Sequence, residues 1–295
     1  MDRKRMLRSF LKVIVSLGIL LFILFKVDFN LLFEAFESLN WFYVVAAFIL
    51  LLMSLFVSGY CVFLFIPERI RFDLFFKSYL LSWSYGLFLP GRLGEFSIAL
   101  FLKKYSVRYE NSIFAMILDK LITVFVLILF SLFVLPELFS FKIGIYLLVG
   151  FGILVLVLFI IFKEWVVRRY MKYFGMFRNY IKNSSGLIIV NFLLTIFKWI
   201  VVGIAFWFIF RGFGFSIDLV TVVLLNMAIL LLSSLPITIS GWGIREGAAI
   251  VLYGPCGLIK EVVLACYLIV RVFYYLLAVV LIGSLYVFKK EKPRG

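Results

Sequence analysis

Histidine is absent from the 295-residue sequence, and cysteine is scarce. Without histidine, neither a Ser-His-Asp nor a Cys-His catalytic arrangement can form, and the usual zinc-bound water site lacks its ligands. The three cysteines, Cys61, Cys256 and Cys266, show no CxxC spacing, which indicates neither a disulfide framework nor a zinc centre. We expect them to be packing residues, and we expect no metal and no cofactor.

Motifs that handle nucleotides are missing as well. No GxxxxGK[ST] string occurs, so energy from ATP would need a partner protein. No metal-ligand cluster such as DxD occurs either. We therefore expect no catalytic residue, and a membrane-embedded enzyme that uses its carboxylates directly is the least favoured hypothesis.

Charge is scarce too. Charged residues make up 15% of the sequence and hydrophobic residues 65%, with a mean hydropathy of +1.18, whereas soluble domains are about half apolar. Residues 41–66, 143–162 and 219–244 each hold 20 or more residues without an ionisable side chain. Such runs cross about 30 Å of hydrocarbon as helices, the only single segments that satisfy their own backbone there. The sequence predicts an all-α integral membrane protein in the cell membrane, as one membrane domain.

About six full spans are expected. They are residues 10–27, 41–66, 112–135, 143–162, 186–210 and 262–288. The first has basic residues ahead of a short apolar stretch, as a signal peptide does, but no small-residue cleavage pattern follows, so we interpret it as a retained span.

The basic residues indicate an orientation. The net charge is +15, and with the N-terminus in the cytoplasm the cytoplasmic segments carry 21 lysines and arginines against 3 in the outer loops. Cytoplasmic loops of membrane proteins are enriched in these residues. We therefore predict a multi-pass protein with both termini in the cytoplasm. Binding to nucleic acid is not expected, because no basic stripe with interleaved aromatics exists outside these loops.

Two stretches of the sequence read alike. Asp73 precedes Pro90 by 17 residues, and Asp218 precedes Pro236 by 18. The separations from Glu95 to Lys120 and from Glu246 to Arg271 are both 25 residues. The chain is then divided into a first span and loop (1–40), repeat 1 (41–135), a linking span with a basic cytoplasmic loop (136–186), repeat 2 (187–287) and a cytoplasmic tail (288–295).

Each repeat contains a break in an apolar stretch. The residues assigned to the breaks are Pro90, Gly91, Gly94, Pro236, Gly241 and Gly243. The apolar arm that follows each break is too short to span a bilayer, so each copy predicts a broken, re-entrant hairpin. The first hairpin would open to the cytoplasm and the second to the outside, and the odd number of crossings between the copies would make them inverted repeats, as in transporters that alternate access.

Charged residues accompany the breaks. They are Arg92, Glu95, Lys120, Arg245, Glu246 and Arg271, with further intramembrane charges at Asp119 and Lys198. A charge at mid-bilayer costs about 2.5–3.5 kcal/mol unless it is paired or hydrated. One interpretation is a polar substrate-binding cavity; the other is a set of structural ion pairs. Pairing of Glu95 with Lys120 or Arg92, and of Glu246 with Arg271 or Arg245, satisfies both.

The strings FLPGRLGE at residues 88–95 and LPITISGWGIREG at residues 235–247 resemble the two signature regions of the lysylphosphatidylglycerol synthase transmembrane-region family. That family includes the flippase part of the bacterial multiple peptide resistance factor and the membrane part of an archaeal dolichol-phosphate hexosyltransferase. The resemblance covers nearly the whole chain. The sequence given ends at Gly295, without the aminoacyl-transferase domain of the resistance factor, so we do not expect synthase activity.

The resemblance implies a membrane lipid or a lipid-linked substrate that moves between leaflets. The first hypothesis is a flippase-like transporter in which Arg92 and Arg245 contact a headgroup phosphate, while Glu95 and Glu246 hold those arginines or bind a cationic group. The alternative is a non-transporting membrane subunit that binds a polyprenyl-phosphate for a glycosyltransferase partner. The sequence leaves the lipid, the energy source and the oligomeric state open.

Overall fold

The computed structural model describes residues 27–138, 180–182, 185–234 and 240–290, besides Gly18, Phe22 and Phe25. These residues contain no strand. Most of the predicted span 10–27, the span 143–162, most of the basic loop after it, Pro236 and the last five residues lie outside the described residues, as do the side chains of residues 90–93. The all-helical fold class is confirmed within the described part of the chain.

Four described helices are long and apolar enough to cross a membrane. They contain the candidate spans Trp41–Phe63, Tyr109–Phe133, Ser185–Gly212 and Lys260–Ser284. The helices themselves are α3 (Trp41–Phe63), α6 (Tyr109–Leu138), α8 (Ser185–Gly212) and α11 (Lys260–Lys290). Each corresponds to one of the predicted spans. Most of the predicted span 10–27 and all of the predicted span 143–162 lie outside the described residues.

The remaining described elements are short. They are α2 (Phe29–Glu37), α4 (Phe72–Phe88), the 3-10 helix η1 (Pro90–Ser97), α5 (Ile98–Leu102), η2 (Lys103–Tyr105), α9 (Leu219–Ser233), α10 (Ile244–Tyr253) and η3 (Gly254–Cys256). Helix α2 lies in the stretch that the sequence analysis treated as a loop. The Asp28 carboxylate caps it by accepting hydrogen bonds from the backbone N–H groups of Asn30 and Leu31.

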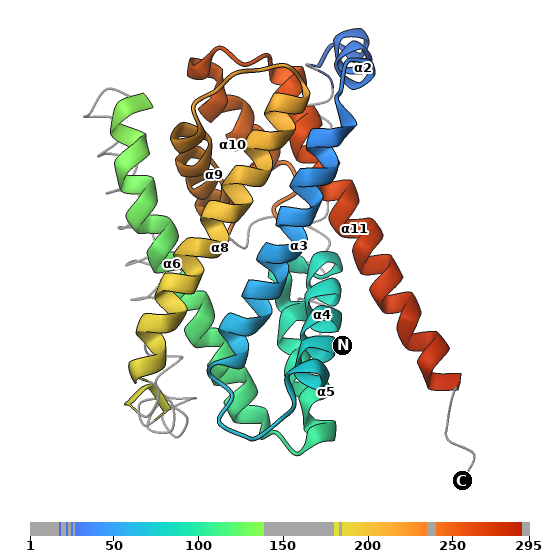
Figure 1. The fold of residues 1–295 in the computed structure, drawn as a ribbon, viewed down its shortest axis with the longest axis vertical. Coiled ribbons are helices and arrows are strands. Elements are labelled where there is room, and N and C mark those ends of the chain that lie inside the picture. Colours follow the sequence, from blue (N-terminus) through green and yellow to red (C-terminus); the bar gives the residue numbers. More distant parts are fainter. Residues whose placement is uncertain are drawn as a thin grey trace.

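The short helices form two broken hairpins at opposite ends of the molecule (Figure 1). Helices α4 and α5 lie in the lower half of the view, and α9 and α10 lie in the upper half. The break of each hairpin faces the middle of the molecule, and the four long helices lie around the two hairpins. Neither hairpin arm has the length of a full span, because α4 has 17 residues and α9 has 15.

The two halves of the chain repeat the same order of elements. A long helix (α3, α8) is followed by a half-length helix, a break, a short helix, a single 3-10 turn and another long helix (α6, α11). Each 3-10 turn is followed by a residue in the left-handed region, Ser106 (φ 60°) in the first half and Gly257 (φ 76°) in the second. The two residues are 151 positions apart, the same offset that separates Glu95 from Glu246 and Lys120 from Arg271.

Equivalent long helices run in opposite directions (Figure 1). Helix α3 descends while α8 ascends, and α6 ascends while α11 descends. A backbone hydrogen bond confirms the first pairing, because the Asn40 N–H before α3 donates to the Gly212 carbonyl at the end of α8 (2.9 Å). Close approach is possible along α8 where Gly203 faces α9, since a Cβ there would lie 2.7 Å from Val223 Cα.

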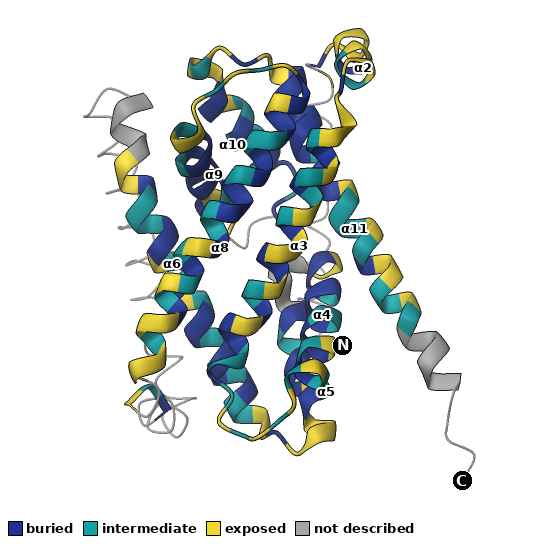
Figure 2. Cartoon of the chain, in the orientation of Figure 1, coloured by how far each residue is buried: buried dark blue, intermediate teal, exposed yellow. Residues whose placement is uncertain are grey.

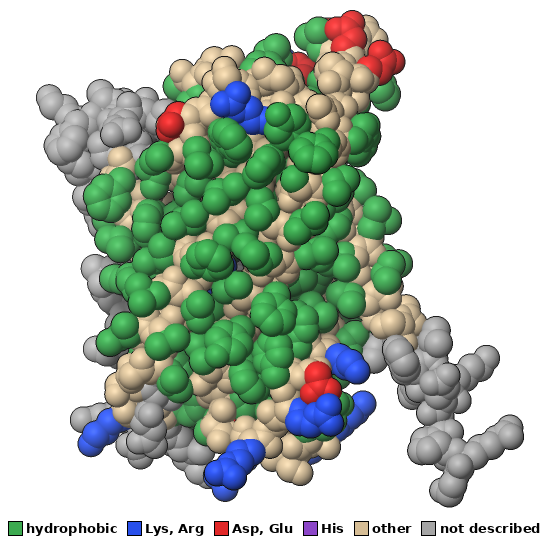
Figure 3. Space-filling view, in the orientation of Figure 1, with side chains coloured by type: hydrophobic (Ala, Val, Ile, Leu, Met, Phe, Trp, Pro, Cys, Tyr) green, Lys and Arg blue, Asp and Glu red, His purple; other side chains and the backbone are tan. Residues whose placement is uncertain are grey.

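The outer surface is apolar between its two charged ends. Buried residues lie in the interior of the helix assembly (Figure 2), and a hydrophobic belt covers the face seen in Figure 3. At one end lie exposed basic residues around the α4–α5 hairpin, namely Arg69, Arg71, Lys77, Lys103, Lys104 and Arg108. Acidic residues of α2 are exposed at the other end. An apolar belt of this kind is what contact with lipid tails requires.

Candidate transport site at the helix breaks

The first break is a change from α-helix to 3-10 helix in close contact with the helix it leaves. The backbone of Leu89 is extended (φ −101°, ψ 142°), and η1 starts at Pro90, whose missing N–H costs nothing at a helix start. Gly94 lies directly against α4: a Cβ on it would lie 2.3 Å from the Tyr85 carbonyl oxygen. A glycine is therefore required at position 94 for backbone contact, as the sequence indicated for a break residue.

Glu95 packs against Gly86 of α4 and forms an ion pair with Lys120 of α6. The Lys120 Nζ lies 2.5 Å from Glu95 Oε2, which confirms one of the two pairings considered for this carboxylate. The Glu95 side chain is 6% exposed, whereas that of Lys120 is 41% exposed. A Cβ on Gly86 would lie 2.5 Å from the Glu95 Cγ, so the bare glycine makes room for the carboxylate.

The second break is a tight backbone turn. Ser240, Gly241 and Gly243 have positive φ angles of 49°, 76° and 80°, a region that glycine adopts at no steric cost. The Gly243 N–H donates to Glu246 Oε2 (2.8 Å), so the carboxylate satisfies a free backbone donor at the start of α10. Gly241 and Gly243 thus have the turn role predicted for them.

Glu246 also forms an ion pair with Arg271 of α11. Its Oε1 lies 2.5 Å from Arg271 Nη2, and both side chains are buried, at 1% and 9% exposed. The Arg271 guanidinium lies 4.4 Å from the centroid of the Trp242 ring. The Trp242 ring therefore packs on this ion pair. Trp83 of α4 is also buried, at 7% exposed, and packs edge-on against Tyr274 of α11.

A hydrogen-bond chain joins the two breaks. Trp242 Nε1–H donates to the Tyr275 hydroxyl (2.8 Å), and that hydroxyl donates to the Leu87 carbonyl near the end of α4 (3.1 Å). The ring of Phe88 packs edge-on against Tyr275. Carbonyls in the last turn of a helix have no intrahelical partner, and here a side chain from the other half of the chain supplies one.

Arg245 has a different environment from the other described charges of the two breaks. Its guanidinium lies 5.6 Å from the Phe206 ring centroid and 5.3 Å from that of Tyr267. Its Nε is buried without a hydrogen-bond partner, and no ion pair joins it to a carboxylate of the described residues. Beside it, Tyr267 donates to Asn226 Oδ1 (3.2 Å), while the Asn226 Nδ2 is also buried without a partner.

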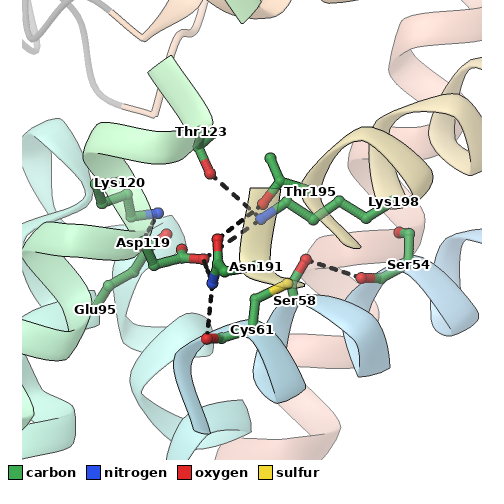
Figure 4. A network of polar contacts seen from close by, with 10 residues as sticks. All are labelled: Ser54, Ser58, Cys61, Glu95, Asp119, Lys120, Thr123, Asn191, Thr195 and Lys198. Atoms are coloured by element: carbon green, nitrogen blue, oxygen red, sulfur yellow. Dashed lines mark hydrogen bonds and ion pairs between the residues drawn. The ribbon is translucent and has the colours of Figure 1, made fainter. Parts of the chain in front are cut away.

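A second polar network lies between α3, α6 and α8 (Figure 4). Asp119 Oδ1 lies 3.7 Å from Lys198 Nζ, and Asn191 Nδ2 donates to Asp119 (3.3 Å) and to the Cys61 carbonyl (2.9 Å). Thr195 donates to Asn191 (3.2 Å). The sequence identifies Asp119 and Lys198 as intramembrane charges but does not predict that they pair. The signal was present, because Asn191, Thr195 and Lys198 follow an i, i+4, i+7 spacing on one helix face.

The predicted site residues thus form pairs within each half. Glu95 with Lys120 and Glu246 with Arg271 are in contact, and Arg245 lies apart on its two aromatic rings. The Arg92 side chain and Pro236 are outside the described residues. Convergence of the four break charges on one cavity stays a prediction. Asn226, Tyr267 and Tyr275 were missed by the sequence analysis, because an uncharged polar residue in an apolar run does not reveal its neighbours.

Comparison with protein families decides the relationship. The family model described as lysylphosphatidylglycerol synthase TM region matches residues 9–283. The chain belongs to this family. The match includes both broken hairpins and all four described candidate spans, except for the last residue of the fourth, and membership identifies a multi-pass membrane protein. No curated protein and no solved structure matches the chain.

Membership of the lysylphosphatidylglycerol synthase TM region family agrees with the resemblance seen at residues 88–95 and 235–247. Among the described residues, no group of three or more cysteines or acidic side chains could hold a metal ion. The described residues at the two breaks supply ion pairs, aromatic faces and unsatisfied hydrogen-bond donors.

Proposed function

We propose that this member of the lysylphosphatidylglycerol synthase TM region family is a flippase-like transporter. It moves a lipid or lipid-linked substrate with a phosphate-bearing headgroup between leaflets, and it performs no bond-making chemistry itself. Two breaks that meet near the middle of an apolar helix assembly support this, because broken helices give transporters their binding sites at mid-membrane.

The proposal rests on the environment of Arg245, whose guanidinium forms no ion pair with a carboxylate of the described residues. A guanidinium in this setting needs an anion or water, and its neighbour Glu246 is already bound to Arg271 and to the Gly243 N–H. Arg245 Nε and Asn226 Nδ2 are two buried donors without acceptors, and both residues contact Tyr267. A phosphate oxygen supplies the missing charge and the missing acceptors together.

The proposal includes an architecture of six spans with two inverted repeats, related by an axis in the membrane plane. The antiparallel equivalent helices and the oppositely directed hairpins support it. Single cysteines that replace Lys104 and Ser216 test it in a background without native cysteines. We expect a membrane-impermeant thiol reagent to label position 104 only from the cytoplasm and position 216 only from outside. Labelling of both from one side would contradict the inversion.

The proposed orientation places both termini in the cytoplasm. The basic end of the molecule, around the α4–α5 hairpin, supports it, because lysines and arginines are retained on the cytoplasmic side. A reporter that is active only in the cytoplasm, fused after Gly295, is expected to be active. An inactive fusion with a well-expressed, active outside-reporting counterpart would reverse the orientation.

Reconstitution in liposomes with fluorescent anionic phospholipid tests the function. Arg245→Ala is expected to reduce the translocation rate about 10- to 150-fold, since a hydrogen bond to a charged group contributes about 1.5–3 kcal/mol. Arg211→Ala is the matched control, because Arg211 is an exposed arginine that packs on Trp207. Equal rates for both variants would remove the headgroup role of Arg245. Binding of a polyprenyl-phosphate without translocation by the wild type would favour the glycosyltransferase-subunit alternative.

A further inference from the structure

Helix α2 is held at the level where long helices begin and end. The Asp28 N–H before it donates to Glu261 Oε1 at the start of α11 (3.2 Å), and the Asn40 N–H after it donates to the Gly212 carbonyl at the end of α8 (2.9 Å). Both hydrogen bonds lie at one end of the helix assembly, so α2 lies across that end, beside the start of α3 (Figure 1). Its nine residues extend about 14 Å, far less than a span requires.

One stripe of α2 packs on the protein. Leu32 is buried, and Ala35 and Phe36 are partly buried. The Phe36 ring packs edge-on against Phe213, with 6.2 Å between the ring centroids. This contact and the two backbone hydrogen bonds determine how the helix is rotated about its own axis.

Apolar side chains continue past this packed stripe on both sides. Phe29, Leu31 and Phe33 are 51%, 44% and 65% exposed. With about 3.6 residues per turn, Phe29 and Phe33 lie on one side of Leu32 and Phe36, and Leu31 lies on the other. The described part of the protein covers only the middle of this apolar arc, so its two flanks need another apolar environment.

The remaining face of α2 is polar. Asn30, Glu34 and Glu37 follow an i, i+4, i+7 spacing, and all three are exposed. A helix with this division of faces lies in the plane of a membrane interface, with its apolar arc toward the acyl chains and its polar face toward water. The helix contains no lysine or arginine, so apolar area, and not attraction to anionic headgroups, is the source of its affinity for lipid.

The apolar belt of the molecule begins directly after α2. Trp41, Phe42 and Val45 are exposed in the first turns of α3, and tryptophan at the end of a span is typical of the membrane interface. Exposed Arg211 and Lys260 lie at the same ends of α8 and α11 that hold α2, which marks this level as the headgroup region. In Figure 3 apolar side chains lie beside the acidic ones at this corner of the molecule, above the hydrophobic belt.

We propose that α2 is an interfacial helix whose partner is the lipid surface itself. Phe29, Leu31 and Phe33 enter the boundary between headgroups and acyl chains, while Glu34 and Glu37 face the water. The leaflet is the outer one in the orientation proposed above. Because α2 is bound to α8 and α11, the contact anchors the two long helices that flank the second hairpin to that leaflet. The inference goes beyond transport and does not depend on it.

Nitroxide labels on the full-length protein in phosphatidylcholine liposomes test the placement of α2. Phe29→Cys or Glu34→Cys is introduced after Cys61, Cys256 and Cys266 have been replaced by alanine. Oxygen concentrates in lipid, whereas a nickel chelate, present on both sides of the membrane, stays in water. We expect the Phe29→Cys label to collide more often with oxygen, and the label of the matched control Glu34→Cys to collide more often with the nickel chelate. A Phe29→Cys label that favours the nickel chelate as strongly as the control does overturns the proposal.

A second set of variants tests whether the phenylalanines provide the attachment. A label at Leu31→Cys reports the position of the helix in Phe29→Ser/Phe33→Ser and in the control Glu34→Ser/Glu37→Ser. We expect its collisions to shift from oxygen to the nickel chelate in the first variant and to stay with oxygen in the control. A label that stays with oxygen in both variants would show that the contacts to the protein alone hold α2, which overturns the role of the phenylalanines.

A second copy of the chain is the competing occupant of this face. Dipolar broadening of the Phe29→Cys spectrum that disappears on dilution with unlabelled protein would place a second copy there and overturn the proposal. We expect the same spectrum before and after dilution. Lipid translocation is measured separately in the same liposomes. Labels that behave as expected without any translocation would remove the transport function and leave the interfacial helix.

Discussion

The first helix break holds its ion pair near the surface, whereas the second encloses it. At the first break the lysine of the pair is 41% exposed; at the second the arginine is 9% exposed and covered by the Trp242 ring. The first break relies on backbone contact at Gly94, and the second on positive φ angles at Gly241 and Gly243. Corresponding positions in the two halves of the chain can thus be stabilised by different physical means.

The difference extends to the unpaired charge. The described part of the second half contains two arginines and one glutamate at its break, so one positive charge is left for an anion. In the described side chains of the first half, the charges at Glu95 and Lys120 balance. The second break therefore combines a rigid, enclosed ion pair with an adjacent donor site, and we expect it to be the more sensitive of the two to substitution.

Glu246→Gln is expected to have the largest effect on stability. It leaves the buried Arg271 charge without its carboxylate, which costs about 3–5 kcal/mol for an enclosed pair. Glu95→Gln leaves an accessible lysine, and we expect a loss of about 1 kcal/mol or less. Melting temperatures of both variants in one detergent compare them. Equal decreases in melting temperature would mean that burial of the ion pair does not determine its contribution to stability.

Gly94→Ala is expected to have the second-largest effect on stability. The new Cβ would lie 2.3 Å from a backbone oxygen of α4, so η1 must move away, at about 1–3 kcal/mol for overpacking. Gly243→Ala places a side chain at φ 80° and costs about 1–2 kcal/mol. Gly186→Ala is the control, because a Cβ there meets no atom within 4 Å. We expect the melting temperature to fall most for Gly94→Ala, less for Gly243→Ala and least for Gly186→Ala. The reverse order would contradict the explanation by backbone contact and positive φ.

Tyr275→Phe tests whether the two breaks stabilise one another. The substitution removes the hydroxyl between Trp242 and the Leu87 carbonyl, and we expect a loss of about 0.5–1.5 kcal/mol. A double-mutant cycle with Trp242→Phe measures the coupling. Additive effects of the two substitutions would show that the hydrogen-bond chain does not connect the breaks.

Asp218→Ala is expected to lower the stability less than the substitutions above. Backbone and hydroxyl hydrogen bonds from Thr221 lower the pKa of the Asp218 carboxyl at the exposed start of α9. A lowered pKa in the folded state means that the cap stabilises the protein above the unfolded pKa of about 3.9 and loses this effect as the pH falls through the folded value. The difference in melting temperature from the wild type should shrink below about pH 3.9. Asp73→Ala is the control. It is expected to change the melting temperature less than Asp218→Ala does, because Asp73 pairs with Arg71 and does not cap a helix.

Much of the fold could be predicted because membrane helices depend on length and hydropathy alone. The long apolar runs defined α3, α6, α8 and α11, and the spacing from Glu95 to Lys120 placed both partners of an ion pair. Other features depend on which helix faces which. Helix α2 was not anticipated, because its nine residues follow no long apolar run. The contact between Asp119 and Lys198 requires that α6 and α8 lie side by side, which no local pattern reports.

The buried pairs also impose an order on biosynthesis. Glu95 is made before Lys120, so α6 can enter the bilayer with its partner already present. Asp119 enters at the same moment, yet Lys198 follows 79 residues later, roughly 4–16 s at about 5–20 residues per second. During that interval a lone carboxylate in hydrocarbon is a burden of about 2.5–3.5 kcal/mol for the insertion machinery. The ion pair that offsets this cost forms only after α8 has been made.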